Sequence, residues 1–207
     1  MQNNEIIRQL IDKKIVTISP DKDFVYASGM HSPIYTDLRQ TISFPKLRQA
    51  IAENLAALIK QEFPKVTVIG GVATAGIPHA AWVAQVMNLP MVYVRSKPKD
   101  HGQGRQIEGR LSMDDHIVLI DDLISTGGSV LSAVQAVKDT GAHVDGISSI
   151  FTYLLPDADE NFKKADTKFA PLLNYRELIE QEIAETVSEE QYKELLAWHQ
   201  DPWNWKR

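Results

Sequence analysis

The spacing of apolar residues predicts helices and short strands in the first third of the chain. Residues 4–13 place apolar side chains at helical spacing on one face, so we predict an amphipathic helix there. Residues 15–37 alternate short apolar runs with a Ser-Gly break and a proline, which indicates short strands and turns. Pro45 stands where the first turn of a helix tolerates proline, and the helical pattern continues to residue 63.

From residue 66 onwards the pattern changes to strands and helices in alternation. The strands are nearly continuous apolar runs, as expected when helices cover both faces of a parallel sheet. The alternation therefore predicts a doubly wound α/β fold, with a mostly parallel sheet flanked by helices. The predicted strands lie at 66–72, 91–97, 116–122 and 142–155, and the predicted helices lie at 75–87 and 127–141.

The 207 residues suit a single domain with its own hydrophobic core. We divide it into an N-terminal hood of helix and short strands at about 1–40, an α/β core at about 45–155, and a C-terminal helical part at about 156–207. The last part is predicted to contain a helix from Asp157, a short strand at 168–173, and helices from about Asn174 and Ser188.

Composition and charge narrow the classes of function. The net charge of −5 lacks the basic surplus that is typical of nucleic-acid-binding proteins, so we expect no nucleic-acid partner. No apolar run approaches the roughly 20 residues of a membrane span, so we expect no membrane partner. The first residues do not follow the pattern of a secretory signal, and the absence of cysteine excludes disulfides, thiolate zinc sites and cysteine nucleophiles. These features predict a cytoplasmic protein.

One apolar strand ends in an unusual polar sequence: residues 117–130 read IVLIDDLISTGGSV. In an open α/β sheet, ligands bind beyond the carboxyl ends of the strands, where Asp121 and Asp122 are predicted to lie. The following turn leads into a helix N-terminus, whose free N–H groups and dipole favour an anion. Gly127 and Gly128 would let the backbone approach that anion closely. Hydroxyl donors stand beside them at Ser125, Thr126 and Ser129.

A bound anion next to two carboxylates indicates a phosphorylated sugar as the ligand. The aspartates can accept hydrogen bonds from neighbouring ribose hydroxyls while the loop binds the 5′-phosphate. The alternative is that the aspartates only end a strand and the glycines only begin a helix. Because carboxylates, hydroxyls and glycines meet at one helix N-terminus, the pattern favours ligand binding. The stretch is not a Walker A loop, since GxxxxGK[ST] is absent.

Residues 95–110, RSKPKDHGQGRQIEGR, concentrate cations in an otherwise acidic chain. They contain proline and several glycines, and they lack a hydrophobic periodicity that would fold them onto the core. This composition is typical of a long mobile loop, and its place directly after a core strand favours an active-site lid over a solvated surface loop. Its target would be a polyanion such as pyrophosphate. The cationic candidates are Arg95, Lys97, Lys99, His101, Arg105 and Arg110.

Four stretches together resemble the orotate phosphoribosyltransferases, a family of type I phosphoribosyltransferases. Residues 117–130 are similar to the phosphoribosyl-diphosphate signature of the whole superfamily, and 70–80 (GGVATAGIPHA) resemble its loop around the pyrophosphate. Residues 95–109 resemble the catalytic loop of the orotate enzymes, and 26–39 (YASGMHSPIYTDLR) resemble their N-terminal substrate segment. The resemblance spans most of residues 24–155 and implies the type I phosphoribosyltransferase fold.

The resemblance implies one reaction, in which orotate and phosphoribosyl diphosphate give orotidine 5′-monophosphate and pyrophosphate in pyrimidine biosynthesis. It implies Mg²⁺ that arrives mainly as a complex with the diphosphate, so we expect no dedicated metal site in the protein. It also implies a homodimer in which the loop of one subunit closes over the active site of the other.

The resemblance also assigns roles to single residues. Lys99 and His101 of the loop are catalytic, as are Asp121 and Asp122, which hold the ribose hydroxyls. The diphosphate is contacted by Arg95, Lys99 and His101, with Lys97 taking the place of a basic residue that some relatives have at Ser96. The 5′-phosphate lies against Leu123, Ile124, Ser125, Thr126, Gly127, Gly128 and Ser129.

The base site departs from the family pattern. Ser125 matches the hydroxyl that contacts orotate in the family. Tyr153 stands near the position of an arginine that contacts orotate in some relatives, so we assign the orotate carboxylate to Arg39 instead. Tyr35 is predicted to line the base pocket, with core packing as the alternative.

Two other functions stay open on the sequence alone. The signature at 117–130 is shared by many base specificities, so another base could take the place of orotate, although the SPIYTD segment argues against it. A non-catalytic relative could bind phosphoribosyl diphosphate and regulate a nucleic acid. The acidic net charge and the cationic loop both argue against that function.

Overall fold

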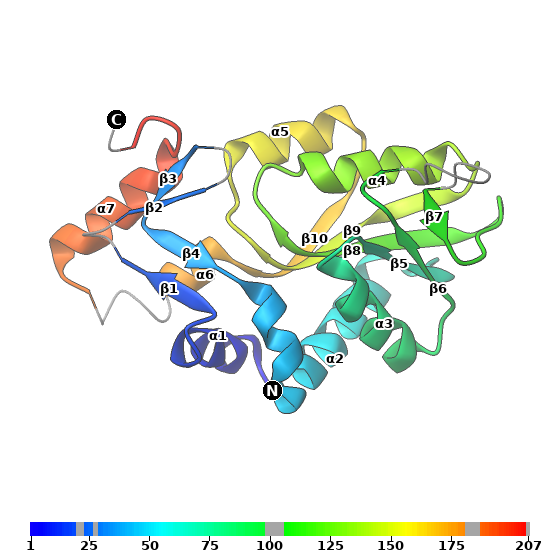
Figure 1. Ribbon diagram of the computed structural model, residues 1–207, viewed down its shortest axis with the longest axis horizontal. Coiled ribbons are helices and arrows are strands. Elements are labelled where there is room, and N and C mark those ends of the chain that lie inside the picture. The colour runs from blue at the N-terminus through cyan, green and yellow to red at the C-terminus, as the bar shows by residue number, and fades with distance from the viewer. Residues whose placement is uncertain (20–22, 27–28, 98–105, 181–186, 206–207) are drawn as a thin grey trace.

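The computed structural model describes residues 1–19, 23–26, 29–97, 106–180 and 187–205, which form a helix-flanked sheet with a smaller hood at one end (Figure 1). The central sheet has six strands in the order β10-β9-β8-β5-β6-β7. The strands are β5 (Val68–Val72), β6 (Met91–Val94), β7 (Ile107–Glu108), β8 (His116–Ile124), β9 (His143–Thr152) and β10 (Phe169–Asn174). All neighbouring pairs are parallel except β6 and β7, so the predicted mostly parallel sheet is confirmed.

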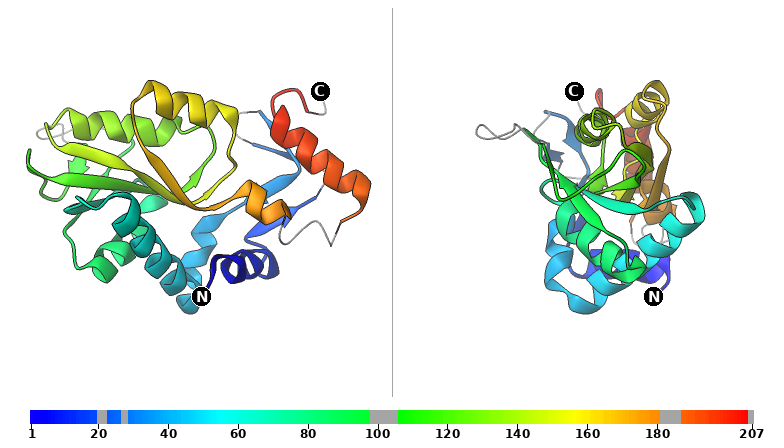
Figure 2. Two further views of the ribbon diagram at one scale, coloured as in Figure 1. Left: turned by 180° about the vertical axis from the view of Figure 1, so that it is seen from behind. Right: turned by 90° about the vertical axis from the view of Figure 1, so that its right-hand side faces the viewer.

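Helices cover both faces of this sheet, and β8 shows how the sequence produces that arrangement (Figure 2). Val118 and Ile120 face a core shared with α2 (Pro45–Glu62) and α3 (Gly76–Met87). Ile117 and Leu119 face the opposite core, which contains residues of α4 (Gly128–Lys138) and α5 (Pro156–Lys164). Successive strand residues point to opposite faces, so a continuously apolar strand is buried on both sides. Within the described residues, no helix has the length and apolar character of a membrane span.

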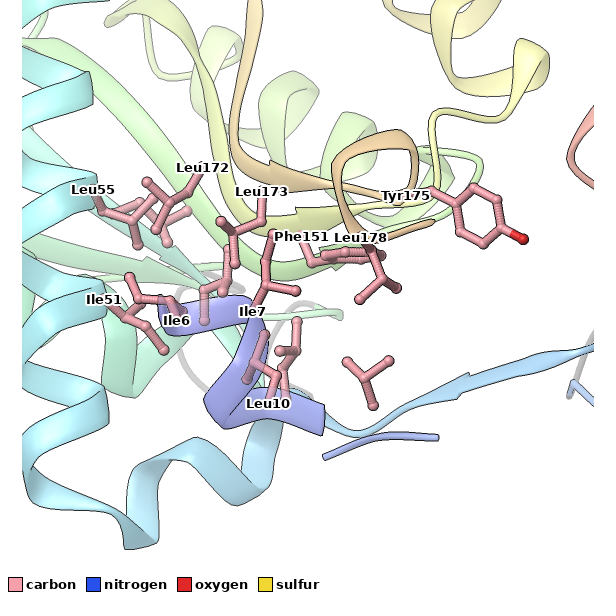
Figure 3. Packing of buried hydrophobic residues seen from close by; sticks show 14 of the residues in the cluster. Ile6, Ile7, Leu10, Ile51, Leu55, Phe151, Leu172, Leu173, Tyr175 and Leu178 are labelled. Carbon is pink, nitrogen blue, oxygen red and sulfur yellow. The ribbon is translucent and has the colours of Figure 1, made fainter. Parts of the chain in front are cut away.

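The hood consists of a helix, a short 3-10 helix and two small antiparallel ribbons, in which β1 pairs with β4 and β2 with β3. Its helix α1 packs its apolar face inward, and Figure 3 shows Ile6, Ile7 and Leu10 beside residues of α2 and β10. The elements are α1 (Asn3–Asp12), β1 (Val16–Ile18), β2 (Phe24–Val25), β3 (His31–Ser32), β4 (Ile34–Thr36) and η1 (Leu38–Ser43).

The C-terminal part contributes to the sheet as well as to the helices. Strand β10 pairs in parallel with β9 and forms an edge of the sheet, so we move the proposed end of the α/β core from about residue 155 to residue 174. The predicted helices follow as α6 (Tyr175–Leu178) and α7 (Glu189–Gln200), capped by the side chains of Asn174 and Ser188. Helix α7 lies beside the hood strands (Figures 1 and 2).

Some strands begin or end at other residues than predicted, because backbone pairing with a neighbouring strand, and not the apolar pattern, determines where a strand ends. Strand β8 runs two residues beyond Asp122, because Leu123 still pairs with Phe151 of β9. The two aspartates therefore belong to the strand itself. Strand β6 ends at Val94, three residues earlier than predicted. Strand β7 was not predicted because two residues carry no readable periodicity.

His79 of α3 makes the stability of the fold depend on pH. Its side chain is 1% exposed, and neither ring nitrogen has a hydrogen-bond partner among the described residues. Burial lowers the pKa of His79 from 6.5 to about 4. Because the folded-state pKa lies below the unfolded-state value, this contribution to stability is complete above pH 6.5 and is lost as the pH falls towards 4.

Urea unfolding between these pH values should separate wild type from His79→Leu. The free energy of unfolding of wild type should fall by up to about 1.4 kcal/mol per pH unit more than that of the variant, since leucine has no group to protonate. His143→Leu, a change at an exposed histidine of β9, should keep the wild-type slope. Identical slopes for wild type and His79→Leu would contradict the account.

Candidate active site

A pocket of about 450 Å³ opens at the carboxyl ends of β5 and β8, where the order of strands in the sheet changes direction. Its wall includes every residue from Asp121 to Ser129, together with Tyr35 and Arg39 of the hood. The pocket therefore brings together the residues predicted to bind the ribose, the 5′-phosphate and the base. Its other lining residues are Thr36, Asp37, Ala75 and Val130.

Asp121 and Asp122 place two carboxylates in this pocket. The backbone N–H of Asp122 donates to Asp121 Oδ1 at 2.9 Å, and that of Leu123 donates to Asp122 Oδ1 at 2.9 Å. Burial raises the pKa of Asp121, and the adjacent charge of Asp122 raises it further. Burial also raises the pKa of Asp122, although the Leu123 N–H and the charge of Arg39 lower it. Such a pair favours hydroxyl donors or a cation as its partner.

The loop between β8 and α4 presents the start of a helix to the pocket. Gly127 forms the N-cap with φ of +81°, and no side chain in the described part of the chain caps this helix. The free N–H groups of its first turn favour an anion. Helix α5 holds the loop from the other side: Asn161 Nδ2 donates to the carbonyl oxygen of Thr126 at 2.9 Å. Phe162 packs so closely that a Cβ on Gly127 would lie 2.9 Å from its ring.

The hood supplies the opposite wall of the pocket. Tyr35 is 42% exposed, and its ring lies 5.5 Å from that of Phe24. Arg39 Nε donates to Asp37 Oδ1 at 2.6 Å. Partial burial raises the pKa of Asp37, but hydrogen bonds from Arg39 and Gln40 outweigh it and hold the pKa below its ordinary value. A guanidinium carries further N–H donors beyond Nε, so Arg39 can also bind a carboxylate.

A second, smaller pocket of about 240 Å³ adjoins the first, because Ser129 lines both. Arg95 and Ser96 lie in its wall, together with Ala73 from the turn after β5. Gln106 also lines it, and its Nε2 donates to the carbonyl oxygen of Arg95 at 2.8 Å. A phosphoryl group in this space would lie next to the anion site at the start of α4.

Two further cations of the 95–110 stretch, Lys97 and Arg110, lie within the described residues, and neither lines the two pockets. Lys97 is exposed. Lys99 and His101 lie outside the described residues, so their contacts with the diphosphate stay predictions.

Comparison with known proteins shows which family the chain belongs to. The model of the phosphoribosyl transferase domain matches residues 42–183. Orotate phosphoribosyltransferase of Lactobacillus johnsonii is 63% identical over 206 residues, which cover 99% of this chain and 97% of that relative. The chain belongs to the orotate phosphoribosyltransferase family.

Solved structures share the fold of this family member. UMP synthase of Leishmania donovani has a TM-score of 0.79 at 25% identity, and the match covers 95% of this chain but 42% of that longer protein. Orotate phosphoribosyltransferase from Aeropyrum pernix has a TM-score of 0.74 at 24% identity, and the match covers 85% of this chain and 97% of that one. The type I phosphoribosyltransferase fold predicted from the sequence is therefore confirmed.

Several residues of the site were not singled out from the sequence of this family member. Thr36 and Asp37 stand in the SPIYTD segment that carries the resemblance. The resemblance marks the whole segment, but within it only Tyr35 was predicted to line the base pocket. Asn161 lies 35 positions from Thr126 in the sequence, and only the packing of α5 brings the two together.

Proposed function

We propose that this chain transfers the 5-phosphoribosyl group from phosphoribosyl diphosphate to orotate, forming orotidine 5′-monophosphate and pyrophosphate in de novo pyrimidine biosynthesis. The observation that carries the proposal is the single pocket that joins the stretch from Asp121 to Ser129 to Tyr35 and Arg39. The 63% identity to a relative that bears the name of this activity, over almost the whole chain, supports it.

The protein binds the phosphoribosyl group through two neighbouring elements. The N–H groups at the start of α4 and the hydroxyls of the loop bind the 5′-phosphate, because a helix N-terminus favours an anion. Asp121 and Asp122 accept hydrogen bonds from the ribose hydroxyls, which restores solvation to carboxylates whose burial is unfavourable. The sugar is thereby fixed at both ends, with its anomeric carbon facing the hood.

The reaction breaks the anomeric C–O bond while a ring nitrogen of orotate, already deprotonated, bonds to the same carbon. The bonding electrons leave with the diphosphate, so positive charge develops on the ribose and negative charge on the leaving group. Cations near the leaving group stabilise that charge most strongly in the transition state. Arg95, Lys97, Lys99 and His101 fill this role, and closure of their loop excludes the water that would otherwise capture the sugar.

Mg²⁺ fits this site as part of the diphosphate substrate. Paired carboxylates whose pKa values are raised by burial form a donor set that favours a nearby cation, and hard oxygen ligands suit Mg²⁺. Bound to the diphosphate, the ion neutralises charge on the leaving group. Asp121 and Asp122 would face it across the ribose hydroxyls.

Substitution by alanine should affect stability at Gly127 but substrate binding at the adjacent Gly128. Gly127→Ala places a side chain at φ of +81° against Phe162, so it should lower the free energy of unfolding by at least about 1 kcal/mol. Gly128 has no atom within 4 Å of its added Cβ, so Gly128→Ala should keep the wild-type melting temperature. Its methyl group enters the space proposed for the 5′-phosphate and should raise the KM for phosphoribosyl diphosphate about 10-fold. An unchanged KM for phosphoribosyl diphosphate would show that the 5′-phosphate does not bind beside Gly128.

Arg39 tests the assignment of orotate to the hood. Loss of a charge-assisted hydrogen bond corresponds to about 1.5–3 kcal/mol, so Arg39→Ala should raise the KM for orotate roughly 10- to 100-fold. The KM for phosphoribosyl diphosphate should stay close to wild type. Arg48→Ala is the matched control, because Arg48 lies on α2 and donates to the Ile42 carbonyl oxygen outside the pocket. If both arginine variants keep the wild-type KM for orotate, its carboxylate binds elsewhere; Ser125 and Tyr35 would then be the remaining assigned contacts.

We also propose that the enzyme is a cytoplasmic homodimer whose 95–110 loop reaches the active site of the partner subunit. The resemblance of residues 95–109 to the catalytic loop of the orotate enzymes supports the shared loop, and the acidic, cysteine-free composition supports the compartment. The whole chain from hood to α7 is proposed to be one domain.

A further inference from the structure

The two walls of the pocket belong to parts of the fold that share no strand ladder within the described residues. Tyr35 and Thr36 lie on β4 of the hood, whereas the paired aspartates lie on β8 of the central sheet. The hood ribbons are only two or three residues long, and short two-stranded ribbons are marginally stable by themselves. Side-chain contacts must therefore fix the base-side wall relative to the ribose-side wall.

Trp198 of α7 makes the first of these contacts. Its side chain is 0% exposed, and Nε1 donates to the carbonyl oxygen of His31 at 2.9 Å, close to the start of the hood segment that reaches the pocket. The ring packs on Tyr175 with a centroid distance of 5.2 Å, and the Tyr175 hydroxyl donates to the Leu195 carbonyl oxygen of α7 at 3.0 Å. Figure 3 shows this hydroxyl pointing away from the apolar cluster.

Tyr26 makes the second contact, from inside the hood. Its hydroxyl donates to the carbonyl oxygen of Ile34 at 2.6 Å and accepts from Ser32 Oγ at 3.0 Å. Burial raises the pKa of Tyr26, so the hydroxyl keeps its proton and stays a donor. Ile34 directly precedes Tyr35, so this bond holds the backbone at the edge of the pocket.

Tyr153 connects both contacts to the central sheet. It follows directly after β9 and is 2% exposed. Its ring stacks on Tyr26 at 5.9 Å and meets Trp198 edge-on at 5.7 Å. The three rings of Tyr26, Tyr153 and Trp198, which we call the aromatic clamp, therefore link the hood, β9 and α7. None of the three residues lines the pocket.

We propose that Trp198 and Tyr26 are positioning residues for the base half of the active site. Through the carbonyl groups of His31 and Ile34, they determine where Tyr35 and Thr36 stand relative to the ribose-binding aspartates. The inference rests on the proposed function and adds the C-terminal helix to base recognition. Asn161 of α5 and the backbone N–H of Tyr153 hold the phosphate loop, through the carbonyl oxygens of Thr126 and Ile124. Changes in the side chains of Trp198 and Tyr26 should therefore affect binding of the base without affecting binding of phosphoribosyl diphosphate. A displacement of about 1 Å is enough to change the rate of a positioned reaction by about 100-fold.

The test removes each donor while keeping an aromatic ring at the position. Trp198→Phe and Tyr26→Phe should each raise the KM for orotate about 10-fold, with the KM for phosphoribosyl diphosphate within about 2-fold of wild type. Trp203→Phe is the matched control, because Trp203 also donates through Nε1, to Asp157 Oδ2, but does so at the exposed end of the chain. It should keep both KM values. Two independent donors are tested, so a folding defect in one variant leaves the other to decide.

Two outcomes would overturn the positioning role. One is an unchanged KM for orotate in a folded Trp198→Phe or Tyr26→Phe protein. The other is a parallel rise of both KM values together with a lower melting temperature, which is the signature of a general structural defect. Failure of the proposed function itself looks different, because wild type would then make no nucleotide from orotate.

Discussion

Replacing Asp121 and Asp122 together by asparagine should lower kcat/KM for phosphoribosyl diphosphate by about 100-fold or more, while the melting temperature rises. In the proposed site each carboxylate accepts a hydrogen bond from a ribose hydroxyl, and a hydrogen bond to a charged group contributes about 1.5–3 kcal/mol. Asparagine keeps the shape but replaces one acceptor oxygen by a donor. Steady-state kinetics and thermal unfolding of the same protein samples measure both effects.

The gain in stability should depend on pH. Burial raises the pKa of Asp121 from 3.8 to about 8, and the charge of Asp122 adds to the effect. A carboxyl group whose folded-state pKa is raised stabilises the fold below its unfolded-state pKa, and this contribution is lost as the pH rises through the folded-state value. The variant should therefore gain stability over wild type progressively between about pH 4 and pH 8.

Asp114→Asn provides the control for this pair. Asp114 is exposed and lies in the turn before β8, at the other end of the same strand. The Asp114→Asn variant should therefore keep the wild-type kcat/KM and the wild-type dependence of stability on pH. A double variant that keeps wild-type kcat/KM would show that the ribose does not bind at the end of β8.

Lys99→Ala should lower kcat by about 100- to 1,000-fold with no change in melting temperature. The predicted contact of Lys99 with the diphosphate becomes stronger as negative charge develops on the leaving group, and loss of one such transition-state contact typically has this size. Lys65→Ala, at an exposed lysine before β5, should keep wild-type turnover. Wild-type kcat in Lys99→Ala would exclude the proposed role of this lysine in catalysis.

The same variant tests whether the loop acts on the partner subunit. In a dimer of one Lys99→Ala subunit and one Asp122→Asn subunit, a shared loop leaves one active site with both native residues and one with neither. Co-expression of the two impaired chains should then restore about a quarter of wild-type activity, since about half of randomly formed dimers are mixed. Activity no higher than that of the separate variants would place the loop over its own subunit.

The core and the glycine turn beside the pocket were predictable because their signals are local. An apolar strand followed by Asp121, Asp122 and a glycine turn specifies both the sheet and the helix start within fourteen consecutive residues, 117–130. Strand pairing, turn and helix N-terminus are neighbours in the chain, so their geometry needs no information from elsewhere. Residues 121–130 of this stretch line the pocket, although β8 continues two residues beyond its predicted end at Asp122.

The base side was less predictable because distant contacts determine it. Only the resemblance identifies the SPIYTD segment as part of the site. We infer that its position depends on the hydrogen bond from Trp198 to the carbonyl oxygen of His31, two residues that lie 167 positions apart in the sequence. A tryptophan in an amphipathic helix indicates burial but not the atom that its N–H will reach. The same limit applies to Asn161, whose only link to the phosphate loop is tertiary.

Product formation from a panel of bases tests the central claim most directly. Purified protein, Mg²⁺ and phosphoribosyl diphosphate are mixed separately with orotate, uracil, adenine, hypoxanthine and xanthine, and nucleotide and pyrophosphate are followed together. The account predicts rapid, equal formation of orotidine 5′-monophosphate and pyrophosphate with orotate and no nucleotide with the other bases. Turnover with another base in preference to orotate, or no turnover with any base, would contradict it.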